Sequence, residues 1–183
     1  INKQVRYAYE NCGFYREHYS DVDVDPTNIT SFEEFEQLPV LTSEDLKQEQ
    51  RDHPPYGRFL CIDEDEISRI YGTSGTTGRP KVFGISDDDW DRIGEWHAQI
   101  LWSVGLRPSD TVIITSPFIQ YLGSWGALRG VDRLGCQAFP FGAGMEGQTE
   151  QAVEWIADLK PEALYGTPSY AIYLGETAKE KGY

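Results

Sequence analysis

Residues 71–81 read Tyr-Gly-Thr-Ser-Gly-Thr-Thr-Gly-Arg-Pro-Lys and form the most distinctive stretch of the chain. Glycines let a backbone turn with several N–H groups on one concave side, and such an arrangement binds anions. The threonine and serine hydroxyls add hydrogen-bond donors, while Arg79 and Lys81 add positive charge. The segment therefore favours binding of the phosphates of a nucleotide, although its spacing differs from that of the common P-loop.

The residues on both sides of this segment have the composition of β-strands. Residues 67–71 read Ile-Ser-Arg-Ile-Tyr, and residues 81–85 read Lys-Val-Phe-Gly-Ile. We therefore expect a β-hairpin whose connection is the candidate phosphate loop. A flexible Gly/Ser/Thr linker is the alternative that the pattern leaves open.

The overall composition limits the kinds of partner. The chain has 183 residues, of which 39% are hydrophobic and 25% charged, as expected for a soluble globular protein. Its net charge of −14 disfavours nucleic acid and anionic membranes, because both are polyanions. No stretch of the sequence has the apolar length of a membrane span.

The cysteine and histidine residues bear on redox compartment and metal binding. The three cysteines are odd in number and far apart, which favours reduced thiols and a cytoplasmic location: Cys12, Cys61 and Cys136. The histidines are scattered and no Cys-x-x-Cys pair occurs, so the spacing predicts no metal site.

An N-terminal helical entry segment is expected over residues 1–60. Apolar residues at helical spacing predict a helix over residues 1–19, with Gly13 as a weak point. Ser31 and Thr42 each stand where an N-cap is favoured, so two further helices are expected.

The end of this entry segment is expected to be irregular. The helix that Thr42 caps is predicted to continue through Lys47. Residues 48–59 are polar and contain the pair Pro54-Pro55, which is incompatible with a regular helix.

Residues 61–183 have the pattern of an α/β unit. A helix is predicted over residues 87–104, with a buried face that includes Ile93, Trp96, Ile100 and Val104. Three apolar runs alternate with further helical patterns: residues 111–115, 136–140 and 163–165. This alternation predicts a parallel sheet of βαβ units with right-handed crossovers. Ligands of such sheets bind beyond the carboxyl ends of the strands.

Residues 71–81 resemble the phosphate-binding signature of the adenylate-forming superfamily, which includes acyl-CoA synthetases, luciferases and nonribosomal peptide adenylation domains. The order of Tyr15-Arg16, Leu38-Pro39 and residues 43–46 ahead of this segment resembles the phenylacetate-CoA ligase branch. The resemblance implies that the loop holds the β- and γ-phosphates of ATP while a carboxylate attacks the α-phosphorus. The residues implied in phosphate binding are Thr73, Ser74, Gly75, Thr76, Thr77, Gly78, Arg79 and Lys81.

The same resemblance implies a pocket for a carboxylic, aromatic acid. The segment with Tyr121, Gly123 and Ser124 is similar to the acid-binding segment of phenylacetate-CoA ligases, with Trp125 bulkier than expected and Leu128 in place of a histidine. The residues of a second motif of that family are expected to shape the floor of the acyl site and the turn from a strand into the last helix, which Thr167 would cap: Thr167, Pro168, Ser169 and Tyr170.

The prediction for the whole is an N-terminal fragment of an ATP-dependent acid–CoA ligase, with residues 61–183 as the front part of its AMP-binding domain. Such a ligase converts a carboxylic acid to an acyl-adenylate and transfers the acyl group to CoA, with ATP, Mg²⁺ and CoA as substrates and cofactor. The catalytic lysine of the lid domain is expected outside this chain, so the fragment alone is expected to be inactive.

Two alternatives stay open from the sequence, as does a homodimeric assembly. One is an adenylyltransferase of the coenzyme F390 synthetase type, and the other is a non-catalytic nucleotide-binding module.

Overall fold

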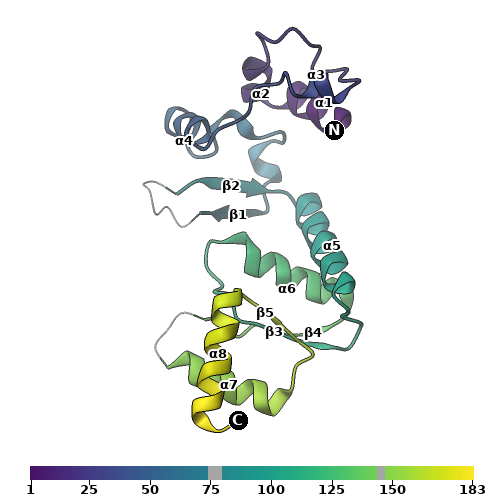
Figure 1. The fold of residues 1–183 in the computed structure, drawn as a ribbon. Coiled ribbons are helices and arrows are strands. Elements are labelled where there is room, and N and C mark those ends of the chain that lie inside the picture. The colour runs from purple at the N-terminus through teal and green to yellow at the C-terminus, as the bar shows by residue number, and fades with distance from the viewer. Residues whose placement is uncertain (74–79, 144–146) are drawn as a thin grey trace. The chain divides into compact units, whose positions relative to one another are not determined.

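The computed structural model describes residues 1–73, 80–143 and 147–183 (Figure 1). The chain forms two compact units, Ile1–Asp87 and Asp88–Tyr183. Their boundary follows the hairpin, whereas the sequence places a domain boundary at residue 60. Compact units need not coincide with functional domains, so the division into residues 1–60 and 61–183 stays a prediction.

Short helices and turns make up most of the first unit. They are α1 (Asn2–Asn11), α2 (Gly13–His18), α3 (Phe32–Phe35), α4 (Ser43–Asp52) and the 3₁₀ turns η1 (Gly57–Phe59) and η2 (Glu64–Glu66). The single helix predicted over residues 1–19 is wrong, because Cys12 has extended φ and ψ angles of −114° and 118°. The buried Cys12 side chain and the small Gly13 mark this break. A small core of Val5, Ile29 and Leu38 holds α1 and α3 together with the segment between α2 and α3.

Both predicted N-caps are confirmed. The side chains of Ser31 and Thr42 each accept a hydrogen bond from a backbone N–H in the first turn of the helix that follows. The predicted end of the second helix is wrong, because α4 continues past Lys47 to Asp52. Residues 48–51 are glutamine, glutamate and arginine, which favour helix, and several of their side chains find hydrogen-bond partners there.

The predicted hairpin is confirmed. Strands β1 (Arg69–Gly72) and β2 (Val82–Ile85) pair antiparallel, with Gly72 opposite Val82. The hairpin therefore presents the ends of the candidate phosphate loop at the tip of two short strands.

The second unit contains the predicted parallel sheet. Its elements are α5 (Asp87–Ser103, beginning at the boundary), β3 (Thr111–Ile114), α6 (Leu122–Leu134), β4 (Gln137–Phe139), α7 (Gln148–Leu159), β5 (Ala163–Tyr165) and α8 (Pro168–Lys181). The central strand β3 pairs in parallel with β4 on one side and β5 on the other. Val112, Ile113 and Ile114 of β3 are fully buried, as their apolar run predicts.

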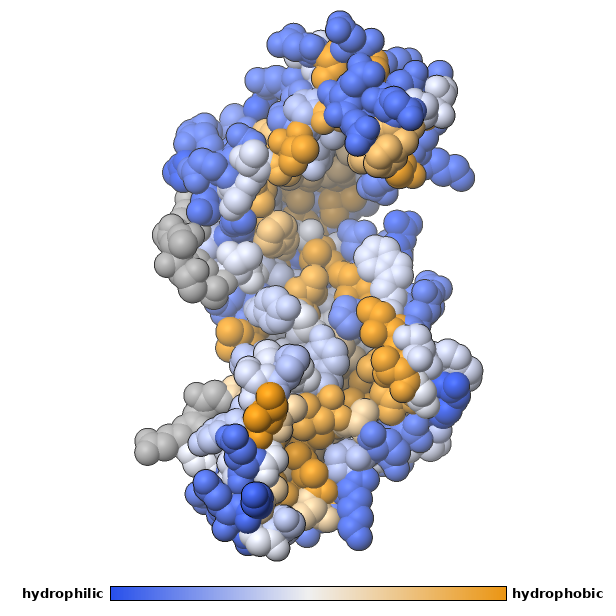
Figure 2. Space-filling model, viewed as in Figure 1, coloured by the Kyte–Doolittle hydropathy of each residue, from blue (hydrophilic) through white to orange (hydrophobic). Residues whose placement is uncertain are grey.

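The buried face predicted for α5 is only partly right. Ile93 and Leu101 are buried, but Trp96, Ile100 and Val104 are exposed by 61%, 59% and 72%. The buried stripe follows Gly94 and His97, where α6 approaches closely through its own glycines. Figure 2 shows apolar residues on the surface along the C-terminal half of α5.

Candidate functional site

The predicted phosphate site lies at the end of the β1–β2 hairpin, and the structure describes two of its residues. Thr73 and Lys81 face each other: the Lys81 N–H donates to Thr73 Oγ1 at 3.1 Å, and the Thr73 N–H donates to the Lys81 carbonyl at 3.0 Å. These bonds join Thr73 to the main chain of Lys81, so the two ends of the predicted site lie next to each other. The remaining predicted residues lie outside the described residues: Ser74, Gly75, Thr76, Thr77, Gly78 and Arg79.

Helix α4 contacts the hairpin directly, at Lys81 and at Val82, the first residue of β2. Lys81 Nζ donates to Ser43 Oγ at 2.8 Å. The Gln50 carboxamide accepts from the Val82 N–H at 3.1 Å and donates to the Val82 carbonyl at 2.6 Å. Sequence reasoning missed Gln50, because it placed this residue in an irregular connection. The one signal in the sequence is that Gln50 follows Leu46 by one helical turn and so shares its face.

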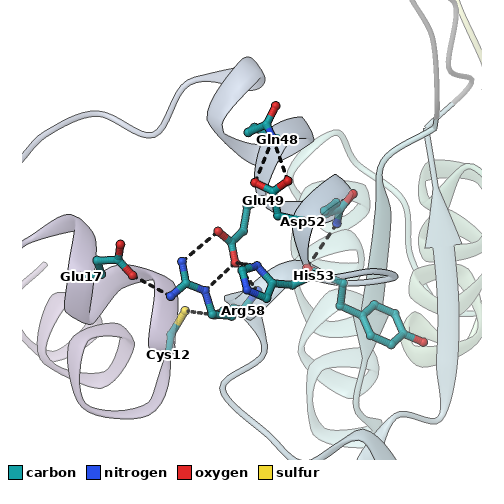
Figure 3. A network of polar contacts seen from close by, with 9 residues as sticks. Cys12, Glu17, Gln48, Glu49, Asp52, His53 and Arg58 are labelled. Carbon is teal, nitrogen blue, oxygen red and sulfur yellow. Dashed lines mark hydrogen bonds and ion pairs between the residues drawn. The ribbon is translucent and has the colours of Figure 1, made fainter.

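The buried carboxylate of Glu49, beside Gln50, links α4 to η1 and α2 (Figure 3). Arg58 donates to both oxygens of Glu49, at 2.7 and 3.0 Å, and to Glu17 at 2.6 Å. His53 Nδ1 lies 3.0 Å from Glu49 Oε1, and Cys12 Sγ donates to the Arg58 carbonyl at 3.0 Å. The hydrogen bonds from Arg58 hold the pKa of Glu49 below its ordinary value of 4.5. With its oxygens bonded in this way, Glu49 has a structural role and is a poor candidate for acid–base chemistry.

A pocket of about 460 Å³ opens in the second unit at the carboxyl ends of β3 and β4. Residues 117–119, 140–143 and Gln148 line it, together with Trp125 and Leu128 of α6. This is the end of the sheet where the strand order predicts a ligand.

The Trp125 ring forms much of one apolar wall of this pocket. It meets the Phe118 ring edge-on with centroids 5.0 Å apart, and Trp125 Nε1 donates to the Ile119 carbonyl at 2.8 Å. These contacts fix the indole plane, so the wall is shaped before any ligand enters.

The residues predicted for the acid pocket near α6 lie beside this pocket. Tyr121 is the N-cap residue of α6 and is 57% exposed. A Cβ on Gly123 would lie 2.3 Å from the Tyr121 ring, so this glycine gives that ring room. Ser124 is fully buried, and its hydroxyl donates to the Pro117 carbonyl at 2.7 Å. The described part of the pocket wall uses their neighbours, Trp125 and Leu128, which sequence reasoning had noted as departures.

The second predicted motif forms the turn from β5 into α8. Thr167 caps α8 by accepting from the Tyr170 N–H, and Pro168 is the first residue of the helix. Ser169 Oγ lies 3.4 Å from Thr167 Oγ1, and the Tyr170 side chain packs on the cluster between α7 and α8. The structural part of the prediction for this motif is confirmed, while its contact with an acyl group stays a prediction.

Within the described ranges, no cluster of three metal-ligating side chains occurs, and no helix is long and apolar enough to cross a membrane.

Comparison with curated proteins gives a consistent match along the whole chain. The chain is 32% identical over 178 residues to the phenylacetate-coenzyme A ligase of Pseudomonas putida, and 33% identical over 182 residues to that of Thermus thermophilus. The chain is a homologue of the phenylacetate-CoA ligases. It spans about two fifths of the length of these relatives, since the matches cover 97% and 100% of this chain but 39% of each ligase. No family model matches the chain.

Comparison with solved structures confirms the fold of this homologue. The crystal structure of 2-hydroxyisobutyryl-CoA ligase in complex with 2-HIB-AMP and CoA is 46% identical and superposes with a TM-score of 0.93. The match covers 98% of this chain and 38% of that ligase. The chain therefore has the mixed α/β fold of the N-terminal part of the adenylate-forming ligases.

Proposed function

We propose that this chain supplies the ATP-phosphate site and the acid pocket of an AMP-forming acid–CoA ligase. The observation that carries the proposal is the hairpin around residues 71–81, which Thr73 and Lys81 close at its foot. The chain that contains this hairpin is homologous to such ligases along the whole of its own sequence. In the proposed reaction a carboxylate attacks the α-phosphorus of ATP, which forms the acyl-adenylate and releases pyrophosphate, and the thiol of CoA then displaces AMP from the acyl group.

The proposed reaction depends little on acid–base residues of this chain. A carboxylic acid is already ionised near neutral pH, so the nucleophile of the first step needs no general base. The pyrophosphate that leaves gains negative charge, and the ammonium of Lys81 at the foot of the loop would stabilise it. Mg²⁺, when bound, would offset further phosphate charge.

An aromatic acid is the substrate class that we infer. The pocket at the carboxyl ends of β3 and β4 has the fixed rings of Phe118 and Trp125 in its wall, and flat rings pack well on such surfaces. Its volume of about 460 Å³ lies within the range of small-molecule sites. The phenylacetate-CoA ligases among its relatives support the same class.

A short branched 2-hydroxy acid is the second candidate. Identity to 2-hydroxyisobutyryl-CoA ligase is 46%, higher than the 32–33% to the phenylacetate-CoA ligases. CoA is the proposed acceptor, because these relatives are all named CoA ligases; adenylyl transfer without CoA is not favoured. We place the protein in the cytoplasm, where its free thiols would stay reduced.

The test uses the protein that contains this chain together with the rest of the ligase. ATP–pyrophosphate exchange dependent on phenylacetate or 2-hydroxyisobutyrate is measured for the wild type, for Thr76→Val with Lys81→Ala, and for the control Lys3→Ala. We expect exchange to fall strongly in the double variant alone, and an unchanged rate would refute the role of the hairpin. The 183 residues alone are expected to form no acyl-CoA.

A further inference from the structure

We propose that Gln50 is a positioning residue for Lys81, and that α4 thereby sets where this cation meets the phosphates of ATP. The inference rests on the proposed function. Within the described residues, the Gln50 side chain bonds to the main chain of Val82 and of Tyr56, so it would act on Lys81 through Val82, the next residue of the chain.

The register of the hairpin explains why Val82 needs a partner outside the hairpin. Thr73 and Lys81 exchange hydrogen bonds across the foot of the loop. In an antiparallel pair, the next residue along a strand turns its N–H and carbonyl to the opposite edge. Val82 therefore presents one donor and one acceptor away from β1, toward α4.

The Gln50 carboxamide satisfies both groups of Val82. It accepts from the N–H at 3.1 Å and donates to the carbonyl at 2.6 Å, as one residue of a third strand would do. Gln50 is only 5% exposed, so water has little access to replace these bonds. A leucine at this position would leave a donor and an acceptor unpaired beside a buried side chain.

A second contact fixes the Lys81 side chain to the same helix. Lys81 Nζ donates to the hydroxyl of Ser43, the first residue of α4. Helix α4 thus holds the ammonium group through Ser43 and the following main-chain residue through Gln50. Two contacts from one rigid element define the position of a flexible lysine better than either does alone.

The helix that makes these contacts is itself anchored. Glu49, the neighbour of Gln50, is 7% exposed and bonded to Arg58, which also binds Glu17 of α2 (Figure 3). The two buried polar residues of α4 therefore have different tasks. Glu49 ties the helix to η1 and α2 through Arg58, and Gln50 ties it to the hairpin.

The experiment compares Gln50→Leu and Gln50→Glu with the control Gln48→Leu in the complete ligase. Gln48 lies on the same helix, is exposed, and bonds to Arg51 and Asp52 of that helix. The measurements are the KM for ATP, the KM for the acid, and the hydrogen-exchange rate of the Val82 amide. The Gln50→Glu variant keeps an acceptor for the Val82 N–H but loses the donor to its carbonyl.

For Gln50→Leu we expect the KM for ATP to rise about tenfold, the loss of roughly one net hydrogen bond, with the KM for the acid unchanged. The Val82 amide should exchange faster in this variant, and Gln50→Glu should show a smaller rise in the KM for ATP. Gln48→Leu should match the wild type in all three measurements.

The positioning role is wrong if Gln50→Leu frees the Val82 amide while both KM values stay those of the control. Equal rises in the KM for ATP and for the acid would also contradict it, because they indicate general damage. If Gln50→Leu does not fold, the KM for ATP of Gln50→Glu decides in the same way. A wild type that does not consume ATP would instead refute the proposed function, and the positioning role with it.

Discussion

The foot of the hairpin in the first unit and the sheet in the second unit are held in place by different forces. Val112 and Ile114 of β3 are fully buried in a cluster of apolar side chains, and Ile113 between them is fully buried as well. The hairpin strands are less protected, with Ile70 exposed by 61% and Phe83 by 40%, and their position depends on hydrogen bonds from Gln50. Burial is strong but non-directional, whereas a pair of hydrogen bonds fixes one register and one orientation. The difference teaches that the candidate phosphate site is placed by a few polar contacts.

The largest effect is expected from a substitution in the buried sheet of the second unit. Ile113→Ala removes a fully buried side chain from the central strand and should lower the free energy of unfolding of the second unit by about 3–4 kcal/mol. Ile172→Ala is the matched control, since Ile172 is 65% exposed and should change stability by less than about 0.5 kcal/mol. Urea denaturation measures both, and equal losses would mean that the sheet does not carry the stability of this unit.

A smaller effect is expected from the ionic link in the first unit. Arg58→Met keeps an apolar stem but removes the guanidinium from the Glu49 carboxylate, which keeps His53 Nδ1 as a neighbour at 3.0 Å. We expect a loss of stability at neutral pH that is smaller than for a fully buried pair, because the Arg58 side chain is 38% exposed and solvent screens the charge. Chemical denaturation, followed by the unfolding of the hairpin, measures this loss. If the variant is as stable as the wild type, the link is dispensable.

The pH dependence of stability sharpens the same prediction. Arg58 lowers the pKa of Glu49 from 4.5, so the folded state binds this proton more weakly than the unfolded state does. The stabilisation is therefore present above about pH 4.5 and is lost as the pH falls through the lower pKa of the folded state. The wild type should lose more stability than Arg58→Met on acidification from about pH 5 to about pH 3. Parallel curves for the two proteins would contradict the assignment.

The smallest effect is expected from a polar contact in the second unit. Ser124→Ala removes the hydroxyl that donates to the Pro117 carbonyl, next to the pocket, and should cost about 1 kcal/mol. Ser103→Ala is the control, because Ser103 is exposed and bonds only one turn back on α5. Thermal denaturation should separate the two variants, and identical melting curves would argue against a role for the Ser124 bond.

Apolar periodicity and turn chemistry predict much of the fold. The run at residues 111–115 gives the central strand, and Ser31, Thr42 and Thr167 cap helices where their positions indicate. These signals are local, so one stretch of sequence contains them. The exposure of Trp96 could not be predicted in this way, because the glycines of α6 decide which face of α5 packs against that helix.

The candidate site is predicted less completely, for a physical reason. The composition of residues 71–81 alone predicts a phosphate-binding loop. Gln50 has no such signal, because its partner is the main chain of Val82, far along the sequence, and every residue type except proline would offer the same N–H and carbonyl there. In the sequence, Trp125 and Leu128 stand out only as departures from a family pattern. In the structure, both residues line the wall of the pocket.

The most direct test of the central claim compares the two regions in one protein. The KM for ATP and the KM for the acid are measured for the complete ligase with Lys81→Ala and, separately, with Trp125→Ala. We predict that Lys81→Ala raises the KM for ATP by about tenfold or more, as expected for a lost bond to a charged group, and leaves the KM for the acid unchanged. Trp125→Ala should do the reverse. If Lys81→Ala leaves the KM for ATP at the wild-type value, the hairpin is not the phosphate site.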